Sequence, residues 1–210
     1  MTTEPQPPAS ARQRLLDAAV LIVRQKGFAA TSVDDLCREA GVTKGAFFHH
    51  FASKDALGVA AADHWSTMTG GFFADAPYHH HADPLQRVLG YLDFRRAILQ
   101  GTLPEFTCLA GTLLQEVHQS SPAIAAACDA AISLHAERIE ADIAAAMAQH
   151  GGLKADWTAA SLALHTQAVL QGAFILAKAK GGPAIAADSI DHLQRYIRLL
   201  FGRPQPQGKD

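Results

Sequence analysis

A chain of 210 residues is long enough to bury a large hydrophobic core, as one domain or as a small domain beside a larger one. Hydrophobic residues make up 49% and charged residues 18% of the chain, which is typical of a soluble, alanine-rich helical protein. The formal net charge of −2 excludes a bulk electrostatic attraction to nucleic acid, so a DNA contact has to come from local placement of cations.

The cysteine count and the apolar runs bear on the compartment. Cys37, Cys108 and Cys128 are too few, and odd in number, for a disulfide framework, which indicates a reducing environment. The longest apolar runs are shorter than a membrane span, and the first ten residues lack the charged and apolar regions of a signal peptide. We therefore expect a cytoplasmic protein with no membrane partner.

The N-terminal elements come first in the chain. Residues 1–9 are polar and rich in proline, so we expect a disordered arm there. Ser10 with Gln13 predicts a capping box, and an apolar stripe at helical spacing continues the first helix to Gly27. The stripe consists of Leu15, Ala19, Ile22 and Val23.

Residues 31–57 predict a helix, a short turn, a second helix and the start of a third. Thr31 or Ser32 can cap the first helix, with an aspartate three residues later (Asp34 or Asp35) to close a capping box. The segment Ala40-Gly41-Val42 breaks the helical pattern, because glycine tolerates the left-handed conformation of a tight turn.

The second of these helices is suited to DNA. Thr43 is its expected N-cap, and the helix carries Lys44, His49 and His50 without an acidic residue. Ser53 caps the next helix, with Lys54 in its first turn. This pattern predicts a helix-turn-helix, whose second helix reads the major groove.

The stretch T-S-V-D-D-L-C-R-E-A-G-V-T-K-G-A-F-F-H-H-F-A-S-K-D-A-L resembles the DNA-binding signature of the TetR/AcrR regulators. A dozen positions agree in type and spacing, over about the first 60 residues. The resemblance implies an all-α fold and a ligand-responsive DNA-binding regulator, a repressor that a small molecule releases from its operator. The chain departs from the family at Phe48, where the usual residue is a tyrosine that hydrogen-bonds a phosphate.

Each residue of this stretch has an expected role. Lys44 and Gly45, at the start of the recognition helix, are placed to reach base edges. Contacts to phosphates are expected from Thr43, His49, Lys54 and the amides at the Ser53 cap. By resemblance Phe48 and His49 face the DNA, whereas Phe47 and Phe51 are expected in the core. The predicted DNA-binding residues are Thr31, Ser32, Thr43, Lys44, Gly45, Phe48, His49 and Lys54.

The rest of the chain predicts further helices and no strands. Residues 74–82 are expected to form a loop, and the helical segments are 53–72, 83–101, 106–118, 121–151, 156–180 and 188–201. The chain is therefore expected to be all α, with about nine helices. We assign residues 10–56 to a DNA-binding domain, 57–203 to a ligand-binding and dimerisation domain, and 204–210 to a tail.

The last two helices predict a homodimer. The helix at 156–180 is apolar around most of its circumference, so it should contact both its own core and a second surface. The helix at 188–201 carries a stripe of Ile190, Leu193, Ile197 and Leu200. Two such pairs from two copies would form a four-helix bundle.

A small-molecule effector needs a cavity, and apolar residues with a few polar ones are typical of such sites. The predicted effector-binding residues are Trp65, Met68, Phe72, Phe94, Phe106, Cys108, Leu109, Gln115, His118, Trp157, His165, Gln171 and Phe174. This set contains no arginine or lysine, which favours a neutral or weakly polar effector over a strongly anionic one.

Two alternative functions remain open from the sequence. Cys108 lies in F-T-C-L-A-G-T-L-L-Q-E, which resembles a segment of electrophile-sensing TetR relatives, so a thiol-sensing repressor is one alternative. Cys108 and Cys128 otherwise act as small hydrophobic residues. The run His79-His80-His81 suggests a second alternative, a metal-binding protein or an enzyme. Adjacent loop histidines, however, cannot all converge on one ion. With no phosphate loop, nucleophile elbow or H-E-x-x-H sequence, we expect no cofactor and no catalysis.

Overall fold

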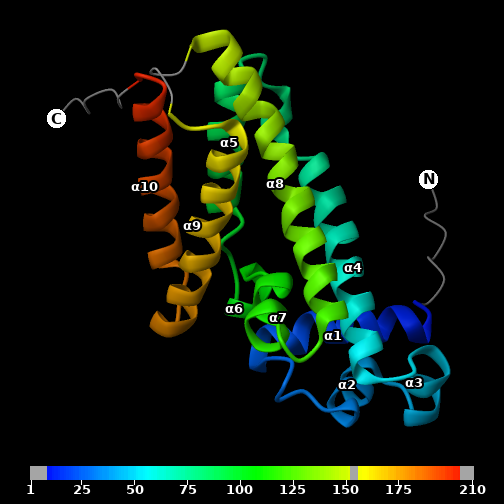
Figure 1. The fold of residues 1–210 in the computed structure, drawn as a ribbon. Coiled ribbons are helices and arrows are strands. Elements are labelled where there is room, and N and C mark those ends of the chain that lie inside the picture. Colours follow the sequence, from blue (N-terminus) through cyan, green and yellow to red (C-terminus); the bar gives the residue numbers. More distant parts are fainter. Residues whose placement is uncertain (1–8, 152–155, 204–210) are drawn as a thin grey trace, which may run out of the picture. The chain divides into compact units, whose positions relative to one another are not determined.

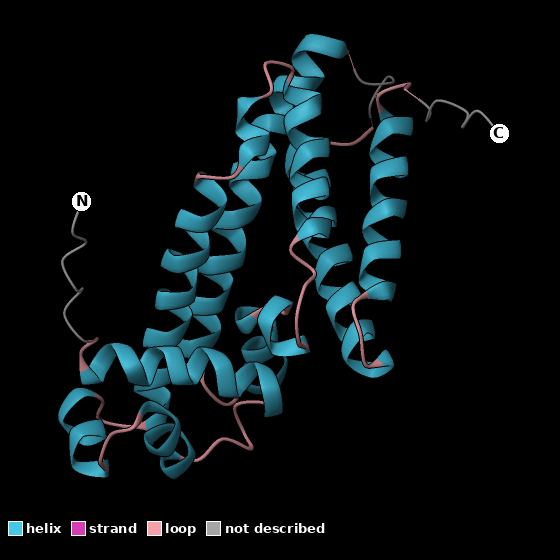
Figure 2. Ribbon diagram, turned by 180° about the vertical axis from the view of Figure 1, so that it is seen from behind, coloured by secondary structure: helices cyan, strands magenta, loops and turns pink. Residues whose placement is uncertain are grey.

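The computed structural model describes residues 9–151 and 156–203 and is helical throughout, with no strand in these two ranges (Figure 2). The predicted arm, apart from residue 9, and the tail at 204–210 lie outside the described residues. The elements, coloured along the chain in Figure 1, are α1 (Ala11–Lys26), α2 (Val33–Ala40), α3 (Lys44–His50), α4 (Lys54–Ala74), the 3-10 helix η1 (Pro77–His80), α5 (Pro84–Ala97), α6 (Leu103–Phe106), α7 (Leu109–Val117), α8 (Pro122–His150), α9 (Ala159–Lys180) and α10 (Ala184–Leu200).

The all-α prediction is confirmed, but two expected elements differ. The described ranges hold ten α-helices instead of about nine, because a short extra helix, α6, precedes the helix predicted at 106–118, which begins at Leu109. Thr102 and Glu105 form a capping box that starts α6 early, and α6 ends at Thr107, whose backbone is extended. The expected loop at 74–82 contains η1.

Capping residues define the N-terminal helices much as the sequence predicts. Ser32 is the N-cap of α2, and its capping box with Asp35 is complete. Gly41 ends α2 in the left-handed conformation, at φ 61°. Ser10 caps α1, but the Gln13 side chain bonds Asp17 instead of closing the predicted box.

The chain divides into two compact units, which we call unit 1 (Met1–Ser66 and Leu109–Cys128) and unit 2 (Thr67–Cys108 and Asp129–Asp210). Unit 1 contains α1 to α3 and α7, and α7 packs against α1. Its core includes Leu15, Leu36, Phe47, Leu57 and Leu109, all almost fully buried. The units do not follow the predicted boundary at residue 56, and the functional division of the chain stays a prediction.

Unit 2 holds α5, α9 and α10, and α10 packs against both α9 and α5. Figure 1 shows α9 and α10 side by side and running in opposite directions. Their core residues include Leu170, Phe174, Ile190, Leu193 and Ile197. α9 follows a complete Thr158–Ser161 capping box and ends at left-handed Gly181.

Among the described residues, α9 is the one helix long and apolar enough to cross a membrane, with a mean hydropathy of 1.3. This departs from the expectation that no apolar run reaches that length. The signal is weak, because core helices of soluble proteins meet the same criteria. α9 buries one side in unit 2, where it packs against α10, and this packing accounts for part of its apolar composition.

Candidate nucleic-acid interface and effector site

The recognition helix α3 is held from beneath by one aromatic side chain. Phe47 is fully buried, and the ring of Phe51 lies 5.9 Å from it, centroid to centroid. Both were predicted in the core, and both are confirmed there. Phe48, the next residue along the helix, is 56% exposed. The anchor at Phe47 therefore leaves the opposite side of α3 open to solvent.

The open side of α3 carries most of the predicted DNA contacts. Ser32, Thr43, Lys44, Gly45, Phe48 and His49 are all exposed. The Thr43 hydroxyl accepts a hydrogen bond from the Ala46 amide, which fixes the start of the helix. A methyl group added at Gly45 would meet nothing closer than the Thr43 hydroxyl oxygen at 3.7 Å, so another molecule can approach the backbone there.

Lys44 has a partner in the free protein. Its ammonium lies 2.8 Å from a carboxylate oxygen of Asp34 on α2, and both side chains are more than half exposed. The hydrogen bond and the charge of Asp34 raise the pKa of Lys44. DNA would have to replace this pair, which is easy because exposed ion pairs are weak and screened by salt.

Two predicted DNA contacts prove to be structural in this conformation. Thr31 is 1% exposed, and its hydroxyl donates to the Gly27 carbonyl at 2.6 Å. The Lys54 ammonium donates to the carbonyls of Phe28 and Thr31, at 3.0 Å each, and lies over the Phe28 ring. These bonds direct Lys54 into the loop between α1 and α2. The phosphate role expected of Lys54 and the DNA contact expected of Thr31 are therefore not supported by the geometry.

Sequence reasoning missed the residues that fix this loop and the start of α2. The Glu116 carboxylate on α7 accepts hydrogen bonds from the amides of Phe28 and Ala29. Asp35 binds Lys26, Ser32 and Arg38, and hydrogen bonds from Lys26 first, then Ser32 and Arg38, hold its pKa well below the usual range. The sequence around Glu116 shows only a single acidic residue on an amphipathic helix. Nothing in it indicates a partner at Phe28, 88 positions away.

The predicted effector residues are divided between the two units. Unit 1 contains Trp65, Leu109, Gln115 and His118. The Arg24 guanidinium lies 4.8 Å from the centroid of the Trp65 ring, and Leu109 is fully buried. The Gln115 amide donates to the Gly111 carbonyl within its own helix, and His118 is exposed. Each of these four side chains therefore has a separate environment.

The other nine residues belong to unit 2 and form separate contacts. Phe72 packs against Phe94 with ring centroids 5.3 Å apart, and Phe106 lies 6.4 Å from Phe174. Trp157 contacts Phe201 instead, and His165 contacts Tyr196. Met68 is exposed, and Cys108 and Gln171 are partly buried.

A cation lies against one of the predicted effector residues, and the preference for a neutral effector stays a prediction. The guanidinium of Arg95 on α5 lies 5.7 Å from the centroid of the Phe174 ring and 4.9 Å from that of Phe73. Phe73 in turn packs against Phe94. No sequence pattern indicates this placement, because Arg95 and Arg96 are adjacent and only the fold distinguishes their environments.

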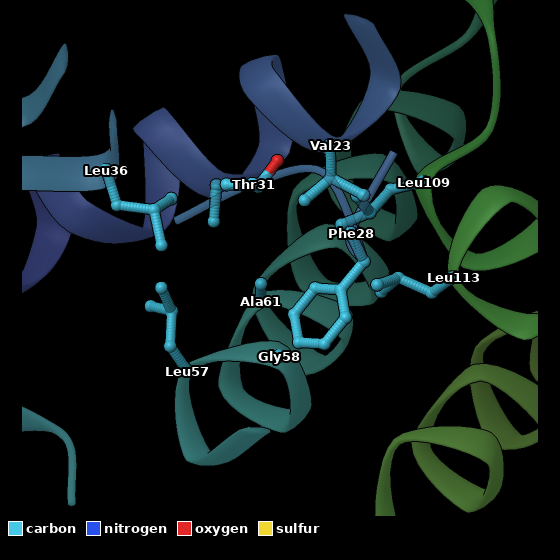
Figure 3. Close-up of a pocket in the computed structure, with 10 residues that line it drawn as sticks. Val23, Phe28, Thr31, Leu36, Leu57, Gly58, Ala61, Leu109 and Leu113 are labelled. Carbon is cyan, nitrogen blue, oxygen red and sulfur yellow. The ribbon is translucent and has the colours of Figure 1, made fainter. Parts of the chain in front are cut away.

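Unit 1 contains a small apolar pocket between α1, α2, α4 and α7. Figure 3 shows the side chains of Phe28, Leu57 and Leu113 around it, with Thr31 at one side. Its volume of about 10 Å³ is at the lower limit for a single water molecule. The pocket is therefore a packing gap and too small for an effector.

The cysteine and histidine alternatives can be placed. Cys128 is fully buried and Cys37 nearly so, in agreement with a packing role, while Cys108 is partly buried and its role as a sensor stays a prediction. The His79 ring bonds the Phe73 carbonyl at 3.0 Å, and the described residues contain no group of three ligands able to hold a metal ion.

Comparison with known proteins agrees with this geometry. Residues 15–61 match the family model described as bacterial regulatory proteins, tetR family. The HTH-type transcriptional repressor NemR of Escherichia coli K12 is 35% identical over 49% of this chain and 47% of its own length. The transposon Tn10 TetC protein of Escherichia coli is 28% identical over 51% of this chain and 67% of its own length. For the uncharacterized regulator YerO of Bacillus subtilis the match spans a fifth of that protein.

Solved structures share the fold along most of the chain. The regulatory protein TetR from Rhodobacter sphaeroides superposes with a TM-score of 0.79 at 24% identity, covering 90% of this chain and 99% of that one. The reduced form of Escherichia coli NemR gives a TM-score of 0.75 at 21% identity, over 87% and 94% of the two chains. These structures show that the chain has the fold of TetR-family regulators, and residues 15–61 match the tetR family model.

Proposed function

We propose that this protein is a homodimeric, cytoplasmic repressor that binds operator DNA through α3 and leaves it when a small molecule binds unit 2. The observation that carries the proposal is the exposed side of α3. There Lys44, Phe48 and His49 project from a helix anchored by buried Phe47, next to the open backbone at Gly45. A helix presented in this way can enter the major groove and place its first residues at base edges.

The exposed apolar residues of α9 and α10 support the dimer. Leu164, Ile175 and Leu176 on α9 and Tyr196 and Leu199 on α10 are each between 44% and 57% exposed. Clustered apolar surface of this kind is typical of protein interfaces. A second copy would bury it by placing its own α9 and α10 against this pair, and an isologous contact of this type closes as a dimer.

DNA binding is tested with a gel-shift titration on a fragment taken from beside the protein's own gene. We expect retardation of this fragment at concentrations that leave random DNA free, and loss of that preference in Lys44→Ala. Lys180→Ala is the matched control, because Lys180 is an exposed lysine at the end of α9. Equal binding of specific and random DNA by the parent protein would reject the proposal.

The dimer is tested by light scattering at micromolar concentration. The parent protein should give twice the mass of one chain, and Leu164→Glu with Leu199→Glu should give a monomer. Glu137→Gln, an exposed change on α8, is the control and should stay dimeric. A monomeric parent protein would contradict the four-helix interface.

A further inference from the structure

Arg95 occupies an unusual place in unit 2. Its guanidinium lies over the rings of Phe73, Tyr91 and Phe174, at 4.9, 5.7 and 5.7 Å from their centroids. Its Nε atom is buried and has no hydrogen-bond partner, and no carboxylate among the described residues pairs with it. The aromatic faces attract the cation, but a ring face offers no acceptor to the buried Nε–H, and the hydrogen bond that the guanidinium makes is to the Tyr91 hydroxyl.

Two other arginines of unit 2 have the carboxylate partner that Arg95 lacks. Arg87 bonds Asp142 at 2.6 Å, and Arg96 bonds Asp191 at 2.9 Å. Both are on α5 with Arg95. Among the described residues, the fold therefore provides carboxylates for Arg87 and Arg96 and none for Arg95.

A second unpartnered donor belongs to the same cluster. Gln167 on α9 is 5% exposed, and its amide nitrogen has no hydrogen-bond partner. Gln167 and Arg95 both approach the Tyr91 hydroxyl closely enough to oppose the rise in its pKa that burial causes. A buried donor without an acceptor is unfavourable, so two that approach one hydroxyl define a place where an oxygen acceptor would bind.

The remaining polar groups of the cluster carry no charge to offset Arg95. The Tyr91 hydroxyl lies 2.9 Å from Nε2 of His135. Burial, together with the charges of Arg95 and Arg138, lowers the pKa of His135 to about 3, so its ring is neutral near pH 7. The cluster thus holds one cation, two unpartnered donors and a surround of aromatic rings.

We propose that Arg95 and Gln167 bind the carboxylate of an aromatic acid, whose ring packs among Phe73, Phe94 and Phe174. A carboxylate offers acceptors to both donors and neutralises the guanidinium, and ion pairs with bidentate geometry are the strongest hydrogen bonds available to arginine. The rings around Arg95 provide the apolar surface that an aromatic body needs. This inference rests on the proposed effector-responsive function and reverses the expectation of a neutral effector.

The test compares three aromatic carboxylates with their uncharged partners. Benzoate, cinnamate and 2-naphthoate, and the three matching primary carboxamides, are titrated into the full-length protein by calorimetry and by thermal unfolding. We expect at least one carboxylate to bind at millimolar or lower concentration and raise the Tm, and its carboxamide to bind about tenfold or more weakly.

Variants then assign the site. Arg95→Met keeps the apolar stem of the side chain but removes the charge and the N–H donors, and it should lose the carboxylate binding. Gln167→Leu should weaken it severalfold, and Arg96→Met is the control that should leave it unchanged. If Arg95→Met does not fold, Gln167→Leu decides, because leucine is close to glutamine in size and removes only the amide.

Three results would overturn the inference. They are no carboxylate binding at millimolar concentration, equal binding of the carboxamides, or undiminished binding in the folded variants. Gel shifts are measured in parallel on the same preparations. If no carboxylate binds while the protein retards its own DNA, the inference fails and the proposed regulator stands. If carboxylates bind but the protein does not retard its own DNA, the carboxylate site stands and the proposed regulator fails.

Discussion

Glu116 and Phe28 are joined by a hydrogen bond from the Phe28 amide to the Glu116 carboxylate, 3.1 Å long. The second carboxylate oxygen accepts from the amide of Ala29 at 2.8 Å. Lys54 donates to carbonyls of the same loop. The loop that leads from α1 into the helix-turn-helix is therefore held by an anion on its amides and a cation on its carbonyls.

Glu116→Gln should lower stability and weaken DNA binding together. The amide can accept only one of the two hydrogen bonds and carries no charge, so the expected loss is about 1 kcal/mol in the free energy of unfolding. Denaturant titration gives this value, and Glu137→Gln on the exposed face of α8 is the control. An unchanged midpoint would mean that water replaces the carboxylate without penalty.

Lys54→Met should lower the stability of the fold, and any loss of DNA affinity should follow from that loss of stability. The ammonium makes two hydrogen bonds to backbone carbonyls and lies 4.4 Å from the centroid of the Phe28 ring. Losing them should reduce the unfolding free energy by about 1–3 kcal/mol. The measurement is chemical unfolding beside a salt series of DNA binding. If stability is retained and the salt slope falls by about one unit, Lys54 binds a phosphate after all.

Phe48→Tyr should tighten operator binding. The ring is exposed on α3 and stands where the family usually has a tyrosine, so only the hydroxyl for a phosphate is missing. One added hydrogen bond predicts a gain of about 0.5–1.5 kcal/mol, measured as the ratio of Kd values for the two proteins. Weaker binding would indicate that Phe48 packs against sugar or base methyl groups, where a hydroxyl is unfavourable.

Gly58→Ala and Gly45→Ala should have opposite effects on stability. A Cβ at Gly58 would lie 2.6 Å from the Ile124 side chain and 3.1 Å from the Phe28 ring, so the core of unit 1 must shift. A Cβ at Gly45 meets no such neighbour, and alanine favours helix by up to about 1 kcal/mol. Thermal unfolding should show a lower Tm for the first and an equal or higher Tm for the second. Gel shifts should show weaker DNA binding for Gly45→Ala, where the new methyl group faces the groove.

His135 should make unit 2 sensitive to acid. Its pKa is lowered to about 3 in the folded protein, chiefly by burial, against about 6.5 in the unfolded chain. Between these values the unfolded state binds more protons, so stability rises with pH and is lost as pH falls from about 6.5 towards 3. His135→Gln should remove part of this slope, by up to about 1.4 kcal/mol per pH unit near pH 5.

Sequence reasoning succeeded where the determinant is local. Ser32, Gly41 and Thr43 define the helix-turn-helix because capping and left-handed turns depend on residues within a few positions. It also placed Phe47 in the core, since apolar residues on one helical face turn inward. The same rules predicted one helix at 106–118 and missed the capping box at Thr102 that starts α6.

The roles of Lys54, Glu116 and Arg95 could not be predicted in this way. Lys54 bonds carbonyls 23 and 26 positions away, and Glu116 bonds amides 87 and 88 positions away. Arg95 is distinguished from Arg96 only by the rings that the fold gathers around it. Charged side chains at such positions look like ordinary solvated residues until the three-dimensional partners are known.

The pair between Lys44 and Asp34 bears on how the protein would search a chromosome. The exposed Asp34 carboxylate places a negative charge beside the Lys44 ammonium, so it reduces the attraction of the leading end of α3 to phosphates although the ion pair itself is weak. A guanine edge, which offers two acceptors in fixed positions, competes for the lysine better than a single phosphate oxygen does. Visits to random sequence should therefore be brief, and the dwell time at a correct base step comparatively long. Replacing Asp34 by asparagine would lengthen the visits everywhere and slow the arrival at the operator.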